Sequence, residues 1–184
     1  MTSDAHPGIL YAIKKIFPDV AWQRCQTHFS RNILDKAPVK YQKGLHTELV
    51  EMYNASTITE ARKIRDRIIS DYNDVAPAAM ECLDEGFESA MTVMVLPNRL
   101  RIFHRTSNHI ERLNRELKRR SKVIGVFPNE ASVIRIMGSV LMDVHETFAS
   151  VHNYGYPTKL LQSIDDYIPQ LKEIADEQLK LLAA

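Results

Sequence analysis

Residues 3–32 read SDAHPGILYAIKKIFPDVAWQRCQTHFSRN, and the elements in this stretch decide how the chain begins to fold. Apolar residues recur at helical spacing through its first half, which predicts a helix from about His6 to Phe17. Asp4 stands just before that helix and is a candidate for its N-cap. A proline ends the helix, and the apolar and aromatic residues after it predict a short strand over Val20–Cys25.

From Thr27 onward the apolar pattern is helical. Four helices are predicted within residues 27–96, where helix formers are frequent and strand-like alternation is missing. Further helices are expected from Thr106 or Ser107 to Gly125, from Phe127 to about Ala149, and from Pro169 to Leu182. The fold class that follows is mainly α, with one or at most two short strands.

The composition is that of an ordinary globular protein, with 45% hydrophobic and 26% charged residues. It excludes collagen-like, disulfide-scaffold and intrinsically disordered classes. The two cysteines, Cys25 and Cys82, form no C-x-x-C pair, so we expect free thiols in a reducing compartment. No apolar run approaches the roughly 20 residues that span a bilayer, and the N-terminus lacks a secretory pattern. We therefore expect a cytoplasmic protein that makes no contact with a membrane.

Positive charge is concentrated in one segment, although the net charge of the whole chain is only +1. Between Arg99 and Lys122 there are nine Lys or Arg against two Glu, which gives this segment +7 and leaves −6 elsewhere. A solvated helix face would account for these charges, but their density favours a polyanionic partner. The candidate DNA-binding residues are Arg112, Arg115, Lys118, Arg119, Arg120 and Lys122.

Two carboxylates are candidate metal ligands. Asp4 either caps the first helix or binds a metal ion at the end of a strand. Glu111 lies within the cationic helix, where it either forms salt bridges or binds a metal ion beside a phosphate-binding surface. The residue spacing alone leaves both alternatives open for each carboxylate.

Cys25 and His28 form a C-x-x-H pair at the end of the predicted strand. Alone it is a weak metal signal, because a structural zinc ion takes four ligands and no second pair is visible. A buried thiol and a hydrogen-bonded imidazole are the simpler interpretation. His104 and His109 are candidates to complete a site, although their spacing supports no specific arrangement.

Three blocks of this sequence together resemble the DDE transposases of mutator-type bacterial insertion sequences. They are SDAHPGILYAI at residues 3–13, WQRCQTHFSRN at residues 22–32, and TSNHIERLNRELKRRSKVIGVFPNEAS at residues 106–132. The blocks follow the order and spacing of that family, and the resemblance covers roughly residues 1–150.

The resemblance implies roles for particular residues. Asp4 would be the second catalytic carboxylate and Glu111 the third, both holding divalent metal ions, expected to be two Mg²⁺ in the intact enzyme. Cys25 and His28 would match the C-x-x-H signature of the family, as structural support for the site. The implied partner is DNA, at the ends of the insertion sequence and at the target, with a homo-oligomeric enzyme and no small-molecule substrate.

The resemblance also implies a domain organisation. The chain would be the C-terminal fragment of an RNase H-like α/β catalytic core with a large helical insertion and one or two short strands retained. The implied parts are a core remnant at 1–28, the insertion at 29–98, the catalytic Glu with the basic and long helices at 99–150, and a helical tail at 151–184.

The first catalytic Asp of the family would lie upstream of Asp4. We therefore expect the chain alone to be inactive, although its family role is DNA cleavage and strand transfer. The alternatives are a non-catalytic helical module that binds DNA or a transposase, and a helical protein without a DNA role.

Overall fold

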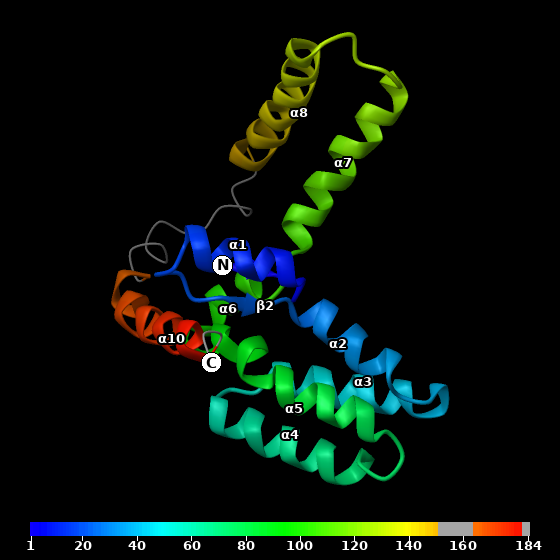
Figure 1. Cartoon of the computed structure of the whole chain (residues 1–184), viewed down its shortest axis with the longest axis vertical. Helices are drawn as coiled ribbons and strands as arrows, with labels where there is room; N and C mark the ends of the chain where they lie inside the picture. The colour runs from blue at the N-terminus through cyan, green and yellow to red at the C-terminus, as the bar shows by residue number, and fades with distance from the viewer. Residues whose placement is uncertain (151–163, 182–184) are drawn as a thin grey trace. The chain divides into compact units, whose positions relative to one another are not determined.

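A computed structural model describes residues 1–150 and 164–181 of the chain, which are mainly helical, as predicted (Figure 1). The elements in chain order are β1 (Thr2–Ser3), α1 (Pro7–Ile16), β2 (Gln23–Arg24), α2 (Gln26–Asp35), α3 (Val39–Tyr53), α4 (Ile58–Tyr72), α5 (Pro77–Met91), η1 (Thr92–Val95), α6 (Asn98–His104), α7 (Asn108–Ile124), α8 (Glu130–Ser150), η2 (Asp165–Tyr167) and α10 (Ile168–Leu181). The chain divides into two compact units. The first comprises Met1–Ser107 and Ile164–Ala184, and the second comprises Asn108–Ser163.

The two short strands pair in parallel, with Thr2 opposite Gln23 and Ser3 opposite Arg24. The amide of Gln23 donates to the carbonyl of Met1 at 2.8 Å, and the amide of Cys25 donates to that of Ser3 at 2.7 Å. The strand predicted over Val20–Cys25 is confirmed, but it is only two residues long. Its partner, β1, ends immediately before Asp4.

The predicted N-cap of the first helix is wrong. His6 is the N-cap of α1, and its imidazole Nδ1 accepts a hydrogen bond from the amide of Gly8 at 3.2 Å. Pro7 explains the difference, because proline favours the first helical position and therefore places the cap at the residue before it. Asp4 lies two residues further upstream and is available for another role.

The four helices predicted within residues 27–96 are confirmed as α2 to α5, and they enclose the hydrophobic core of the first unit. Thr57 is the N-cap of α4, where its hydroxyl accepts from the amide of Glu60 at 3.1 Å. The carboxylate of Glu60 accepts in return from the amide of Ser56 at 2.8 Å. The largest fully buried side chains of this core include Phe29, Ile33, Leu45, Leu49, Met52, Ile68, Met80, Leu83 and Phe87.

One short helix was not predicted. Helix α6 follows Pro97, and its Leu100 is fully buried. The guanidinium of Arg101 donates to the carbonyls of Leu96 at 2.7 Å and Met94 at 3.0 Å. Seven residues are too few for an apolar period to stand out in the sequence, so this helix depends on contacts that the local pattern does not reveal.

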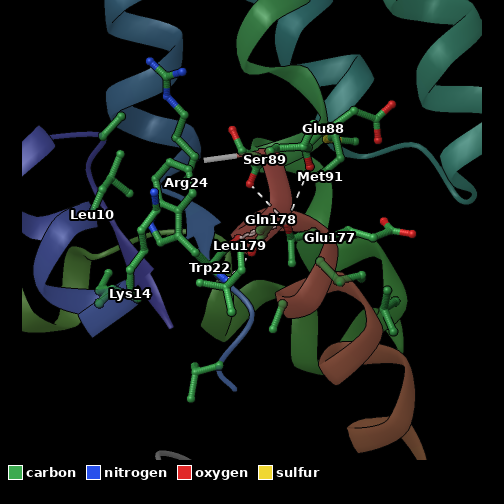
Figure 2. Close-up of a pocket in the computed structure, with 18 of the residues that line it drawn as sticks. Leu10, Lys14, Trp22, Arg24, Glu88, Ser89, Met91, Glu177, Gln178 and Leu179 are labelled. Carbon is green, nitrogen blue, oxygen red and sulfur yellow. Dashed lines mark hydrogen bonds between the residues drawn. The ribbon is translucent and has the colours of Figure 1, made fainter. Parts of the chain in front are cut away.

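Within the first unit, the C-terminal helix α10 contacts the segment before β2 through Gln178 (Figure 2). The side-chain oxygen of Gln178 accepts from the Trp22 amide at 2.8 Å, and its NH₂ group donates to the Trp22 carbonyl at 2.9 Å. This amide therefore occupies the hydrogen-bonding positions that a further strand would take beside Trp22. Ala175, one turn earlier, is buried.

The second unit contains the two helices predicted after Ser107. Helix α7 ends at Ile124, and the next residue, Gly125, has a φ of 75°, a left-handed conformation that favours glycine. Helix α8 carries many apolar residues, of which Val140 is buried. Within the described residues, no helix is both long enough and apolar enough to cross a membrane.

Candidate functional site

Asp4 follows β1 directly, and its carboxylate is poorly satisfied by the protein. Its Oδ1 atom is buried and has no hydrogen-bond partner among the described residues. The backbone beside it is held firmly, because Ser3 Oγ donates to the Asp4 carbonyl at 2.8 Å and Trp22 Nε1 donates to Ser3 Oγ at 2.9 Å. Burying a carboxylate oxygen without a partner costs free energy, and a bound cation would offset that cost.

Cys25 is fully buried at the start of α2, directly after β2. Its sulfur accepts hydrogen bonds from the amide of Ser107 at 3.5 Å and the hydroxyl of Ser107 at 3.4 Å. Burial by itself raises the pKa of the Cys25 thiol. The hydrogen bonds from Ser107, together with those from the backbone and side chain of His28, outweigh burial and lower that pKa.

The structure brings Cys25 and His28 together, as the C-x-x-H spacing predicts. Cys25 is the N-cap of α2, and His28 lies half-buried in its first turn. The role of the pair in the site stays a prediction.

The two other candidate histidines have different outcomes. His104 is half-buried at the end of α6, and its backbone carbonyl accepts from the hydroxyl of Thr2. Burial and, to a lesser extent, the positive charge of the N-terminus lower the pKa of His104. The side chain of His109 lies outside the described residues.

Glu111 is half-buried in the first turn of α7. It belongs to the second unit, whereas Asp4, Cys25 and His28 belong to the first. Each unit therefore presents one of the two carboxylates that the resemblance implies, and their roles as metal ligands stay predictions.

Helix α7 exposes all six of the predicted DNA-binding cations. Glu116 bonds to Arg119 at 2.7 Å and to Arg120 at 3.0 Å. The hydrogen bonds from Arg119 and then Arg120 lower the pKa of Glu116 to about 2. Of the six cations, Arg112, Arg115, Lys118 and Lys122 make no ion pair within the part of the chain that the structure describes.

Sequence reasoning missed two residues that shape this region. Ser107 was considered only as a helix cap, although its hydroxyl and amide both reach the sulfur of Cys25. Trp22 was considered only as a strand residue, although its indole supports Ser3 beside Asp4. The Ser107 contact joins residues 82 positions apart, so no local pattern could have revealed it.

The described residues thus comprise a short parallel strand pair followed by a carboxylate, a helical block, and a cationic helix in the second unit.

Comparison with known sequences defines the class of protein. The profile of the family "Transposase, Mutator family" matches residues 1–151, so the chain belongs to the Mutator family of transposases. The family resemblance of the three sequence blocks is therefore confirmed.

Curated relatives agree with this family. The chain is 43% identical over 149 residues to the transposase for insertion sequence element IS256 in transposon Tn4001 of Staphylococcus aureus, covering 78% of this chain and 37% of that protein. It is 34% identical over 154 residues to the transposase for IS1081 of Mycobacterium tuberculosis, covering 84% of this chain and 37% of that protein. The transposase for ISRM5 of Rhizobium meliloti is 31% identical over 154 residues, covering 84% and 39%. The chain thus spans a little over a third of the length of these relatives.

Proposed function

We propose that this chain is part of an insertion-sequence transposase that cleaves DNA and transfers the cleaved strand, with Asp4 and Glu111 as two of its catalytic carboxylates. The observation that carries the proposal is the buried Oδ1 of Asp4, which has no hydrogen-bond partner among the described residues. Asp4 is the aspartate of the SDAHPG block at residues 3–8, and the chain belongs to the Mutator family.

The strand arrangement supports an RNase H-like origin for this region. In parallel sheets, functional side chains gather at the carboxyl ends of the strands. Asp4 directly follows β1, and Cys25 directly follows the parallel strand β2. The helical block α2–α5 would then be the insertion of that core.

The proposed cofactor is a divalent cation, with Mg²⁺ as the specific proposal. Hard cations take oxygen ligands, and Asp4 and Glu111 would supply carboxylate oxygens. When bound, such ions activate the attacking water or 3′-hydroxyl and stabilise the leaving oxygen. The contribution of the chain is positional, because Ser3 and Trp22 fix the backbone at Asp4 before any ion arrives.

The proposed partner is DNA, whose phosphates α7 would contact without reading sequence. Its six exposed cations fit that role. We further propose that the intact enzyme is a homo-oligomer that acts in the cytoplasm.

Paramagnetic Mn²⁺ tests the metal ligand directly, because it broadens the NMR signals of nearby amides. In the purified chain, Mn²⁺ should broaden the amides of Ser3 and Ala5, and excess Mg²⁺ should reverse the effect. Asp4→Asn should abolish this broadening, whereas the matched control Asp19→Asn, which removes an exposed carboxylate of the same unit, should preserve it. Equal broadening in both variants would contradict the proposal.

The alternative function is a non-catalytic helical module that binds DNA. The exposed cations of α7 favour it as a second candidate. It predicts duplex binding by the chain without any Mn²⁺ effect at Asp4. Metal-dependent nicking of a supercoiled plasmid, lost in Asp4→Asn, would overturn this alternative and our expectation that the chain alone is inactive.

A further inference from the structure

A pocket of about 510 Å³ opens in the first unit between α2, α3 and the segment that precedes α7. Gln26 and Thr27 line it from the first turn of α2, and Thr106 lines it from the residue before Ser107. The pocket therefore adjoins the buried Cys25 and lies entirely within the first unit. Clefts of about 300–1,000 Å³ are the usual size for small-molecule and cofactor sites.

The charged groups around the pocket favour an anion. Arg31 is exposed, and its guanidinium makes no hydrogen bond or ion pair within residues 1–150 and 164–181. The half-buried Arg105 donates to the amide oxygen of Asn54 at 2.9 Å, a neutral partner that leaves the positive charge uncompensated. Among the described lining residues, Asp35 is the single carboxylate. Guanidinium groups without carboxylate partners are suited to form paired hydrogen bonds with a phosphate.

The less exposed lining residues favour a flat, partly apolar group. Leu34 and Tyr53 are half-buried in the pocket. Burial raises the pKa of Tyr53 well above its usual range, so its phenol remains neutral. The side chain of Gln42 donates to the carbonyls of Leu34 at 2.9 Å and Ala37 at 3.0 Å, which holds this amide in place. Apolar, aromatic and amide groups beside cations are the components that recognise a nucleobase and its phosphate.

We propose that this pocket binds one unpaired nucleotide of single-stranded DNA, with its phosphate held by Arg31 and Arg105. A recessed site of this size admits a nucleotide that has left the base stack, whereas it excludes an intact duplex. The inference rests on the proposed DNA-processing function and adds to it a second DNA site, separate from the cationic helix α7. Gln26 and Thr27, which line the pocket, lie between Cys25 and His28 in the sequence, so the proposed nucleotide site adjoins the C-x-x-H pair.

The probe is a 5′-phosphorylated thymidine tetranucleotide, titrated into the isotopically labelled chain at fixed salt. We expect shifts of the amide signals of Thr27, Ser30 and Thr106. Arg31→Gln should weaken binding roughly tenfold, since it removes a charge-assisted hydrogen bond. Asp35→Asn should strengthen binding, because it removes the carboxylate beside the phosphate. The affinity of Arg31→Lys should lie between those of the wild type and Arg31→Gln, because lysine keeps the positive charge but lacks the paired N–H donors of the guanidinium.

Lys63→Gln is the matched control, since it removes one exposed positive charge from α4 of the same unit, away from the pocket. Its affinity should equal that of the wild type, and circular dichroism should show unchanged helix content in every variant. Equal weakening by Arg31→Gln and Lys63→Gln, or shifts confined to α7, would overturn the inference. Shifts confined to α7 would leave the proposed function standing. Absence of Mn²⁺ broadening at Ser3 and Ala5 in the wild-type chain would contradict the proposed function, whatever the pocket binds.

Discussion

At the scale of single residues, Cys25 combines complete burial with a lowered thiol pKa. Burial alone would have the opposite effect, so the hydrogen bonds to sulfur decide the outcome. The hydroxyl of Ser107 provides the strongest of these opposing contributions, followed by the backbone of His28. The sulfur is therefore a stabilised acceptor at the start of α2, which explains how a buried thiol is tolerated beside a candidate active site.

Replacing Ser107 by Ala should raise the pKa of Cys25, because the hydroxyl hydrogen bond is lost while burial remains. The thiol pKa is lower in the folded than in the unfolded chain. The thiolate therefore adds stability above the unfolded pKa, and this contribution is lost as the pH falls through the folded pKa. The free energy of unfolding should thus rise with pH less steeply in Ser107→Ala than in the wild type.

Two measurements check this prediction. The ¹³Cβ shift of Cys25 reports its titration, and urea unfolding at pH 6 and pH 9 reports the stability difference. Ser70→Ala, an exposed hydroxyl on α4, is the matched control and should leave both unchanged. A Cys25 titration that is the same in Ser107→Ala and Ser70→Ala would show that the Ser107 hydroxyl does not stabilise the thiolate.

At the scale of elements, the fit between β2, α2 and α5 depends on a glycine. A Cβ atom at Gly86 of α5 would fall far inside van der Waals contact with the Phe29 ring and with the Arg24 guanidinium. That guanidinium lies over the Phe29 ring at 4.5 Å from its centre, and Phe29 is fully buried. The Phe29 ring belongs to the hydrophobic core and cannot move away without losing packing there.

Gly86→Ala should therefore destabilise the first unit, by about 1–3 kcal/mol for overpacking, less up to about 1 kcal/mol gained in helix propensity. Urea unfolding followed by circular dichroism measures the effect. Gly138→Ala is the control within α8, because its Cβ would meet no atom within 4 Å. It should preserve or raise helix content, and a stabilised Gly86→Ala variant would show that Phe29 and Arg24 can repack.

Helix α7 gives the second prediction at this scale, because its exposed cations are proposed to contact phosphates. For a protein that neutralises Z phosphates, the logarithm of duplex affinity falls with the logarithm of salt concentration at a slope near −0.9Z. Arg119→Ala combined with Arg120→Ala should flatten this slope by about two units if both residues contact phosphate. Both arginines already bond to Glu116, so they would have to share or leave this carboxylate on binding.

Fluorescence anisotropy with a labelled duplex at several salt concentrations measures the slope. The double variant Lys43→Ala with Lys63→Ala removes the same charge from exposed positions of the first unit and should leave the slope unchanged. Because Arg119 and Arg120 are exposed, their replacement should scarcely change the urea midpoint. An unaltered slope in the α7 variant would show that these arginines face solvent and contact no phosphate.

The sequence predicted the long helices well, but it did not predict the short helix α6 or the long-range contacts between elements. Repeated apolar positions place α3, α4 and α8 closely, because each helix has enough turns for its period to be visible. Helix α6 has too few residues for such a period. The residue pattern singled out Asp4 and the C-x-x-H pair, and the family resemblance implied their roles. The Ser107 contact depends on tertiary structure that spans 82 positions.

At the scale of the whole molecule, the first unit is discontinuous in sequence. Helix α10 belongs to the same unit as the strands, although the intervening second unit separates them along the chain. The family match ends at residue 151, so α10 lies beyond it. The pairing of Gln178 with Trp22 joins residues 156 positions apart, which explains why periodicity predicted the helix but not where it packs.

Replacing Gln178 by Glu should weaken the contact of α10 with Trp22. The carboxylate can still accept from the Trp22 amide, but it cannot donate to the Trp22 carbonyl or to the hydroxyl of Thr92, which Gln178 reaches at 2.9 Å and 3.3 Å. A carboxylate oxygen of the new Glu side chain would then face the Trp22 carbonyl oxygen in a half-buried site, which should cost about 1–3 kcal/mol of stability. Hydrogen exchange of the α10 amides should therefore accelerate.

Gln170→Glu makes the same chemical change at an exposed position of α10 and should leave exchange at the wild-type rate. If both variants keep full protection, then apolar contacts such as that of the buried Ala175 hold α10 in place without the glutamine. Faster exchange in Gln178→Glu alone, with the α2–α5 amides still protected, would show that the glutamine joins the C-terminal helix to the strand pair. Trp22 bonds both to Gln178 and to Ser3, the residue before Asp4. The position of Asp4 would then depend on Gln178, a residue outside the family match.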